Sequence, residues 1–190
     1  MSDKTIQNLR LEADDCILVI VDVQERLMSS MKEETKNLIS KNISILIQVA
    51  QKLEIPIIIT EQYPKGLGKT LDEISSITPN IIPFEKISFS CMGSEEFVHS
   101  IRSLKRTKIL LTGVETHVCC YQSTLDLLES GFIVHLISDA TCSRKKHNWK
   151  TALSSLKDVG TYISSTEQVV FDLARVAGTD MFKLISSLVK

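Results

Sequence analysis

The sequence predicts a doubly wound α/β domain, in which a parallel sheet lies between two layers of helices. Short apolar runs rich in β-branched residues alternate with longer segments whose apolar residues repeat at helical spacing. The apolar runs are continuous, which is typical of strands that are buried on both faces of a parallel sheet. Because parallel strands need long crossover connections, this alternation favours a three-layer α-β-α fold.

Length and composition indicate one globular unit. The 190 residues are 43% hydrophobic and 24% charged, which is enough to bury one substantial core. We expect a single domain over residues 1–190, because no repeat, linker or low-complexity tract divides the chain. The net charge of −1 gives no general attraction to nucleic acids or acidic membranes. Without an apolar run of ~18 residues or the apolar core of a secretory signal, the chain is expected to be intracellular, in the cytoplasm or in an organelle.

The first β-α-β unit ends near residue 60. Residues 16–21, CILVIV, predict a buried strand that ends at Asp22. The segment from Asn37 to Leu53 has apolar residues at helical spacing, and Pro56 then opens the strand-like run PIIIT.

The next stretch is less regular. Residues 63–69, YPKGLGK, contain one Pro and two Gly and predict a loop. Residues 81–89, IIPFEKISF, are a weaker strand candidate, because Pro83 lacks the N–H that a central strand would donate. Lys86 falls near the end of this expected strand.

The second half repeats the alternation of strand and helix. Strands are expected at residues 108–114, KILLTGV, at 132–138, FIVHLIS, and, shorter, at 161–163, while Gly131 stands where a helix C-terminal glycine is expected. The apolar residues at helical spacing are Phe97, Ile101 and Leu104; Val118, Tyr121, Leu125 and Leu128, which we expect to face inward; Trp149, Ala152, Leu153 and Leu156; Val169, Val170 and Leu173; and Met181, Leu184, Ile185 and Leu188.

Three residues with reactive side chains follow strands of the predicted sheet. Ligands of doubly wound sheets bind beyond the carboxyl ends of the strands, so Asp22, Lys86 and Cys119 are the first candidates for chemistry. Cys119 falls near the start of a helix, where unpaired N–H groups and the helix dipole favour a thiolate, and we expect its pKa to be lowered. Asp22 could accept the thiol proton, and Lys86 could stabilise both anions.

Each of these residues also has a purely structural interpretation. Cys119 could be an ordinary buried thiol like its neighbour Cys120. Asp22 could cap a turn or pair with a nearby cation, and Lys86 could simply be solvated.

A cysteine/histidine pair is a further alternative, with His117 as the base and Glu115 orienting it. Residues two apart on a helix face different directions, however, so we place His117 outside the reacting groups. The five cysteines form neither an even disulfide set nor a CxxC framework, and the four histidines lack a short ligand spacing. We therefore expect no metal and no cofactor.

Three motifs, in this order along the chain, resemble the isochorismatase-like hydrolases. They are VIVDVQERL at 19–27, FEKISFSC at 84–91, and LLTGVETHVCCYQSTLDLLESGFIVHLISDATCSR at 110–144. The likeness covers nearly the whole chain. The segment TEQYPKGLGKT at 60–70 is similar in particular to the isochorismatase-domain-containing subgroup of animals and protists.

The resemblance implies a six-stranded parallel sheet in the order 3-2-1-4-5-6. It implies a catalytic triad with Asp22 as base, Lys86 as electrostatic partner and Cys119 as nucleophile. It also implies a cis peptide between Val114 and Glu115, which would turn the backbone N–H groups of Glu115 and Cys119 toward one point as an oxyanion hole.

In the implied mechanism Asp22 accepts the proton of Cys119, and the thiolate attacks the carbonyl carbon of a small-molecule substrate to form a thioester-type intermediate. An amide fits this cycle best. Metal-dependent nicotinamidases have further histidines where this chain has Gln62 and Tyr63, and no histidine precedes His99. True isochorismatases lack the nucleophilic cysteine. We therefore expect neither of those two activities.

Other roles remain open. Gln24 should lie on the same side of the strand end as Asp22 and would contact substrate or hold the carboxylate. A reactive cysteine beside Cys120 could serve redox or thioester chemistry, and the fold could instead be an oligomeric interaction module with an inactive triad. The resemblance implies a homo-oligomer, for which Met181–Val189 would either form an interface or pack on its own sheet.

Overall fold

A six-stranded parallel sheet forms the centre of the computed structural model, which describes residues 3–190. The strands lie in the order β3-β2-β1-β4-β5-β6, and all five neighbouring pairs are parallel. Their bounds are β1 Cys16–Val21, β2 Ile57–Gln62, β3 Phe84–Lys86, β4 Lys108–Val114, β5 Ile133–Cys142 and β6 Tyr162–Ser164. The doubly wound fold and the strand order are therefore confirmed. Residues 1 and 2 of the expected single domain lie outside the described residues.

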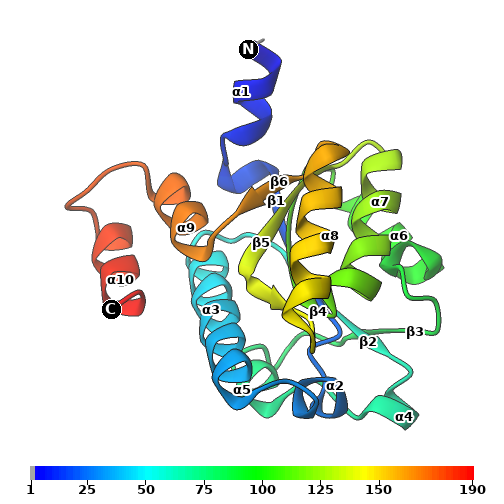
Figure 1. The fold of residues 1–190 in the computed structure, drawn as a ribbon. Coiled ribbons are helices and arrows are strands. Elements are labelled where there is room, and N and C mark those ends of the chain that lie inside the picture. The colour runs from blue at the N-terminus through cyan, green and yellow to red at the C-terminus, as the bar shows by residue number, and fades with distance from the viewer. Residues whose placement is uncertain (1–2) are drawn as a thin grey trace.

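Helices cover both faces of this sheet (Figure 1), with α3, α9 and α10 on one face and α6, α7 and α8 on the other. The α-helices are α1 Asp3–Leu9, α2 Glu25–Ser29, α3 Glu33–Lys52, α4 Pro64–Leu67, α5 Asp72–Ser75, α6 Glu95–Ser103, α7 Tyr121–Glu129, α8 Lys146–Asp158, α9 Thr166–Ala174 and α10 Asp180–Leu188. Two 3-10 turns, η1 Ala13–Asp15 and η2 Cys91–Gly93, and one π-helical turn, η3 Thr116–Cys120, complete the described elements.

Strand β1 divides the core into two layers. All six of its residues are buried. Leu18 and Ile20 pack in the cluster that includes α3, whereas Ile17 and Val19 pack in the cluster that includes α6, α7 and α8. Because successive side chains of a strand point to opposite faces, a strand covered on both faces must be apolar throughout. This is why CILVIV is continuous rather than alternating.

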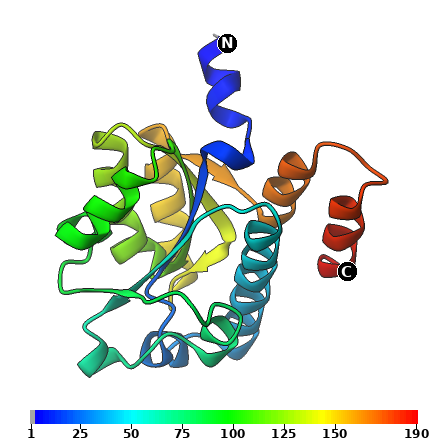
Figure 2. The same ribbon diagram turned by 180° about the vertical axis from the view of Figure 1, so that it is seen from behind.

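The chain reverses its direction across the sheet between β1 and β4, which pair along their full length. The crevice of a doubly wound sheet opens at such a switch point, beyond the carboxyl ends of the strands. Figure 2 shows this end of the molecule opposite the N-terminal helix, with the short helices that follow β1 and β2 around it.

One prediction of local structure was wrong and a second was incomplete. Residues 64–67, expected in a loop, form the single turn α4, where the fixed φ of Pro64 suits the first helical position. The four residues expected to face inward from the helix after β4, Val118, Tyr121, Leu125 and Leu128, do pack against the core, but they are only partly buried. The π-helical turn changes the angular spacing of its side chains, so the buried face consists instead of Cys119, Cys120, Ser123, Thr124 and Leu127.

The C-terminal segment packs on its own fold. Helix α10 contacts α9 and α3, and Ile185 is fully buried there. None of the helices within residues 3–190 combines the length and the apolar composition that crossing a membrane would require.

Candidate active site

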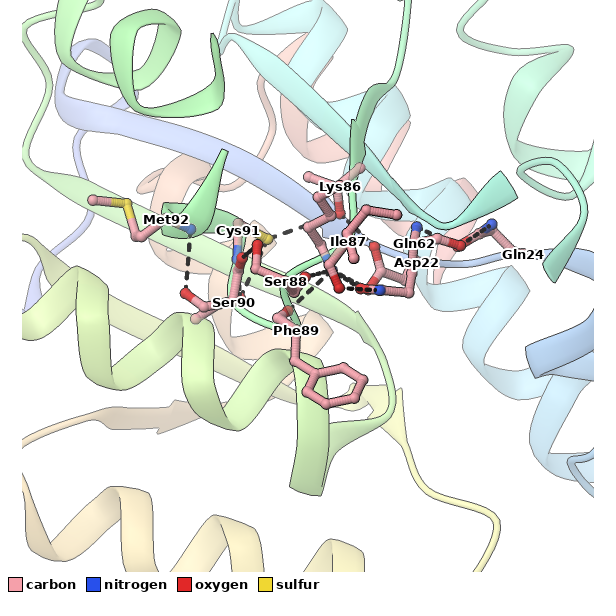
Figure 3. A network of polar contacts seen from close by, with 12 residues as sticks. Asp22, Gln24, Gln62, Lys86, Ile87, Ser88, Phe89, Ser90, Cys91 and Met92 are labelled. Atoms are coloured by element: carbon pink, nitrogen blue, oxygen red, sulfur yellow. Dashed lines mark hydrogen bonds and ion pairs between the residues drawn. The ribbon is translucent and has the colours of Figure 1, made fainter. Parts of the chain in front are cut away.

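The carboxyl ends of β1, β2 and β3 bring three polar side chains together (Figure 3). Asp22 follows β1, Gln62 ends β2 and Lys86 ends β3. The Lys86 Nζ lies 2.7 Å from Asp22 Oδ2, and the two side chains are 1% and 0% exposed. Sequence spacing therefore placed Asp22 and Lys86 correctly at one edge of the sheet. The alternative of a solvated lysine is wrong.

The ammonium group of Lys86 is fully engaged. It donates to Asp22 Oδ2 at 2.7 Å, to Gln62 Oε1 at 2.8 Å, and to the backbone oxygens of Phe89 and Ser88 at 3.0 and 3.3 Å. Four acceptors occupy its three N–H donors. Burial is the largest single influence and lowers the pKa of Lys86, but the negative charge and hydrogen bond of Asp22, together with the neighbouring Cys91 and Cys119, outweigh it, so the pKa lies above its usual value. Lys86 is thus a permanent cation that stabilises charge and does not transfer a proton.

The carboxylate of Asp22 is held from two strands. Thr60 Oγ1 of β2 donates to Asp22 Oδ1 at 2.7 Å, opposite the contact of Lys86 with Oδ2. The backbone N–H of Asp22 also donates to the backbone oxygen of Thr60 at 3.1 Å. Asp22 has a φ of +53°, in the left-handed region that Asp adopts more readily than most residues. Both the backbone and the carboxylate of Asp22 are therefore fixed.

Cys119 lies in the π-helical turn after β4 and is 5% exposed. Burial raises the pKa of its thiol, and the negative charge of Asp22 raises it further, while Lys86 lowers it. The net effect is a pKa above the usual value, so the lowered pKa expected from the helix position is wrong. The start of the helix is visible in the sequence, whereas the burial of the thiol, the largest cause of its raised pKa, is not.

Two residues that flank Cys119 have other partners. The Glu115 carboxylate accepts the backbone N–H of Arg144 at 2.9 Å and lies 3.4 Å from the Arg144 side chain. His117 Nδ1 lies 2.9 Å from Ser143 Oγ, which agrees with placing it outside the reacting groups. The peptide bond between Val114 and Glu115 is cis. The oxyanion hole at Glu115 and Cys119 stays a prediction.

Gln24 connects the end of β2 to the loop that follows it. Its amide nitrogen donates to the backbone oxygens of Gln62 and Gly68, at 3.1 and 2.7 Å, and its amide oxygen accepts the Gln62 N–H at 2.7 Å. These partners belong to the backbone, so Gln24 holds the loop rather than the Asp22 carboxylate. Its contact with substrate stays a prediction.

A surface cavity of about 450 Å³ lies beside the ion pair and is lined by Lys86 together with Tyr63, Glu85, Ser88 and Ser94 among others. Within residues 3–190 no three His, Cys, Asp or Glu side chains are grouped to hold a metal ion.

Sequence reasoning missed several residues of this site. Gln62 was considered only as a position where related enzymes have metal ligands, yet its side chain accepts from Lys86 and donates to the Ile87 backbone oxygen at 2.6 Å. Cys91 lies inside the motif at residues 84–91 but had no assigned role. Thr60 lies in an apolar strand and gave no signal at all.

Relatives share this sequence over nearly its full length. A protein of Danio rerio, "Isochorismatase domain-containing protein 2", is 36% identical over 180 residues, covering 94% of this chain and 89% of that protein. The "Secreted isochorismatase effector Isc1" of Phytophthora sojae is 36% identical over 194 residues, covering 100% of this chain and 91% of that protein.

Solved structures share the fold. The MAR1 ribonuclease of Caenorhabditis elegans superposes with a TM-score of 0.87 at 32% identity, covering 95% of this chain and 92% of that chain. The Escherichia coli YcaC protein, described as an octameric hydrolase of unknown specificity, superposes with a TM-score of 0.88 at 22% identity, covering 95% and 89%. At that identity the second likeness concerns the fold alone.

The family model described as "Isochorismatase domain" matches residues 16–168, a range that contains the Asp22–Lys86 pair and Cys119. With the strand order, the paired charges at the strand ends and relatives at 36% identity all in agreement, this chain belongs to the isochorismatase family of hydrolases.

Proposed function

We propose that this protein is a metal-independent cysteine hydrolase that cleaves a C–N bond of a small-molecule amide. Asp22 is the base, Lys86 the electrostatic partner and Cys119 the nucleophile. The observation that supports this most strongly is the ion pair of Asp22 and Lys86, buried at the strand ends within electrostatic reach of the Cys119 thiol. Gln62 supports a reaction without metal, because it stands where metal-dependent relatives would have a ligand and its side chain is instead hydrogen-bonded to Lys86 and to the Ile87 backbone oxygen.

Charge balance explains how a thiol with a raised pKa can still act. Asp22 and Lys86 together are neutral, so ionising Cys119 beside them would leave an unpaired negative charge in a buried site. If the proton passes instead from Cys119 to Asp22, the thiolate replaces the carboxylate as the partner of Lys86 and the total charge stays constant. The exchange of the proton therefore avoids leaving an unpaired charge in the buried site.

The chemical steps follow from this exchange. The thiolate attacks the amide carbon, and the N–H groups of Glu115 and Cys119 stabilise the oxyanion. Protonated Asp22 gives its proton to the departing amine, which leaves a thioester on Cys119. Asp22 then takes a proton from water as the water attacks the thioester. Collapse of this intermediate breaks the C–S bond and expels the Cys119 thiolate, which takes the proton back from Asp22, and the acid leaves.

A mass-spectrometric screen across many amides tests this proposal. The wild-type protein is incubated with a library of small primary and secondary amides, in the presence and absence of a chelator, beside a Cys119→Ala variant. We expect amine release by the wild type in both conditions, none by the variant, and an acyl adduct on the Cys119 peptide. Equal turnover by the variant, or turnover that the chelator abolishes, would overturn the proposal. Because one relative is called a ribonuclease, single-stranded RNA is included as a comparison substrate.

We also infer that the protein forms a homo-oligomer. Three apolar side chains in the segments that flank the edge strand β3 are exposed, Ile82 at 86%, Ile87 at 74% and Phe89 at 51%. Large apolar side chains gathered at a sheet edge are typical of a surface that is covered in an assembly. Light scattering checks this inference, because a mass of 21.3 kDa, that of one chain, would contradict it.

A further inference from the structure

A second line of polar side chains continues behind Asp22, away from Lys86. Thr60 Oγ1, which donates to Asp22 Oδ1 at 2.7 Å, lies 3.8 Å from Cys91 Sγ. Ser123 Oγ donates to Cys91 Sγ at 3.2 Å and accepts the Cys91 backbone N–H at 2.9 Å. All four residues are fully buried. The mechanism above uses only Asp22, although Figure 3 shows Cys91 in the same polar network as Asp22 and Lys86.

The direction of this chain of hydrogen bonds is fixed by the number of protons. Each hydroxyl or thiol has one hydrogen to donate, and an ionised carboxylate only accepts. The Thr60 hydrogen must therefore point at Asp22, which leaves the Thr60 oxygen as acceptor for the Cys91 S–H. The Cys91 sulfur in turn accepts from Ser123. Every donor in the line points toward the carboxylate.

This direction requires Cys91 to remain a thiol. If it ionised, the single hydrogen of Thr60 would have to serve two anions. Burial raises the pKa of Cys91 to about 11, and the negative charge of Asp22 acts in the same direction, so the thiol form persists at neutral pH. Cys91 is thus a buried donor and not a second nucleophile.

We propose that Thr60 is a positioning residue for Asp22. The Thr60 hydroxyl, oriented by Cys91 and Ser123, fixes the Asp22 carboxylate and compensates part of its negative charge. The inference rests on the proposed function, since it concerns how the base is prepared for Cys119. Lys86 from β3 and Thr60 from β2 hold opposite oxygens, so the carboxylate cannot rotate without losing a donor. Hydrogen bonds to an ionised group are the strong ones, so both contacts matter.

The test measures alkylation of Cys119 by iodoacetamide from pH 6 to 10, followed by peptide mass spectrometry. Thr60→Val keeps the shape and removes the donor, whereas Thr60→Ser keeps the donor. Thr112→Val is a matched control, because Thr112 is also a fully buried strand residue whose hydroxyl donates to a backbone oxygen, that of Val19, at 3.2 Å.

We expect Thr60→Val to raise the midpoint of Cys119 alkylation, which slows alkylation about three- to tenfold near the wild-type midpoint, because an uncompensated carboxylate disfavours a neighbouring thiolate more strongly. Thr60→Ser should restore the wild-type profile and Thr112→Val should leave it unchanged. If Thr60→Val matches the wild type, or if Thr112→Val slows alkylation equally, the positioning role is refuted.

Two further variants separate this inference from the proposed function and guard against misfolding. Asp22→Asn, measured in parallel, tests whether the carboxylate acts on Cys119 at all, and an unchanged profile there would refute the proposed function itself. If Thr60→Val does not fold, Cys91→Ala tests the same line of donors. Cys91→Ala removes only the hydrogen bond that orients Thr60, so Cys119 alkylation should slow less than in Thr60→Val. If alkylation does not slow at all, Cys91 does not orient Thr60.

Discussion

Replacing Asp22 should lower the pKa of the Cys119 thiol, and replacing Lys86 should raise it. Asp22→Asn removes the negative charge that raises the pKa of the Cys119 thiol and leaves Lys86 without a counter-charge. Lys86→Met removes the only one of these influences that lowers the pKa and leaves the carboxylate uncompensated.

The size of the effect follows from the burial of the pair. A charge within about 4 to 6 Å changes a pKa by about 1 to 3 pH units, and the two side chains here are at most 1% exposed, so solvent screens them little. We expect the midpoint of Cys119 alkylation to fall by at least about 1 pH unit in Asp22→Asn, which is about tenfold in rate below the midpoint. In Lys86→Met it should rise by a similar amount.

The assay is the pH dependence of iodoacetamide labelling at the Cys119 peptide, with labelling of the buried Cys91 as an internal measure of unfolding. Lys86→Met leaves a buried charge unpaired, which destabilises a protein by about 3 to 5 kcal/mol, so each profile is accompanied by a thermal melt. Midpoints that move in the same direction in the two variants, or that do not move in folded protein, would refute the coupling of the three residues.

Three further predictions concern the fold. Burial raises the pKa of the fully buried Cys16 to about 12, whereas the thiol of the unfolded chain ionises near pH 8.5, roughly its ordinary value. Between these two pH values the unfolded state binds fewer protons than the folded state, so the free energy of unfolding falls as the pH rises from the lower value to the higher. Urea unfolding from pH 8 to 11 should show a shallower loss in Cys16→Ala, and equal slopes would contradict this. Gly113→Ala should prevent folding or lower stability by more than about 4 kcal/mol, measured by thermal melting, because its Cβ would lie 2.0 Å from the Val21 backbone oxygen. Ile185→Ala should lower the free energy of unfolding by about 2 to 5 kcal/mol, whereas Leu38→Ala, at a side chain 51% exposed, should lower it little. A small loss of stability for Ile185→Ala would place α10 away from the core.

The fold was predictable because its signals are local. The run CILVIV is apolar at every position, and a strand of that kind has few alternatives to the middle of a parallel sheet. The positions of Asp22 and Lys86 followed from the same logic, since both stand at strand ends. Even the three-residue strand β3 was found, although Pro83 weakened its signal.

The electrostatics of the site were not predictable, because they depend on register and on neighbours distant in the sequence. Thr60 reaches Asp22 only because β2 pairs with β1 so that Val21 lies opposite Thr60. The pKa of Cys119 was predicted in the wrong direction because the sequence shows the start of a helix but not how deeply the thiol is buried, and burial is the largest influence on its pKa.

The ammonium of Lys86 holds the segment after β3 through the backbone oxygens of Ser88 and Phe89, so the position of this segment does not depend on which side chains it carries. Ile87 and Phe89 are exposed at 74% and 51%, on a main chain that is tied down from within. A substitution of Ile87, which lines the cavity, can therefore reshape its rim without removing the carbonyl groups that hold the ammonium of Lys86.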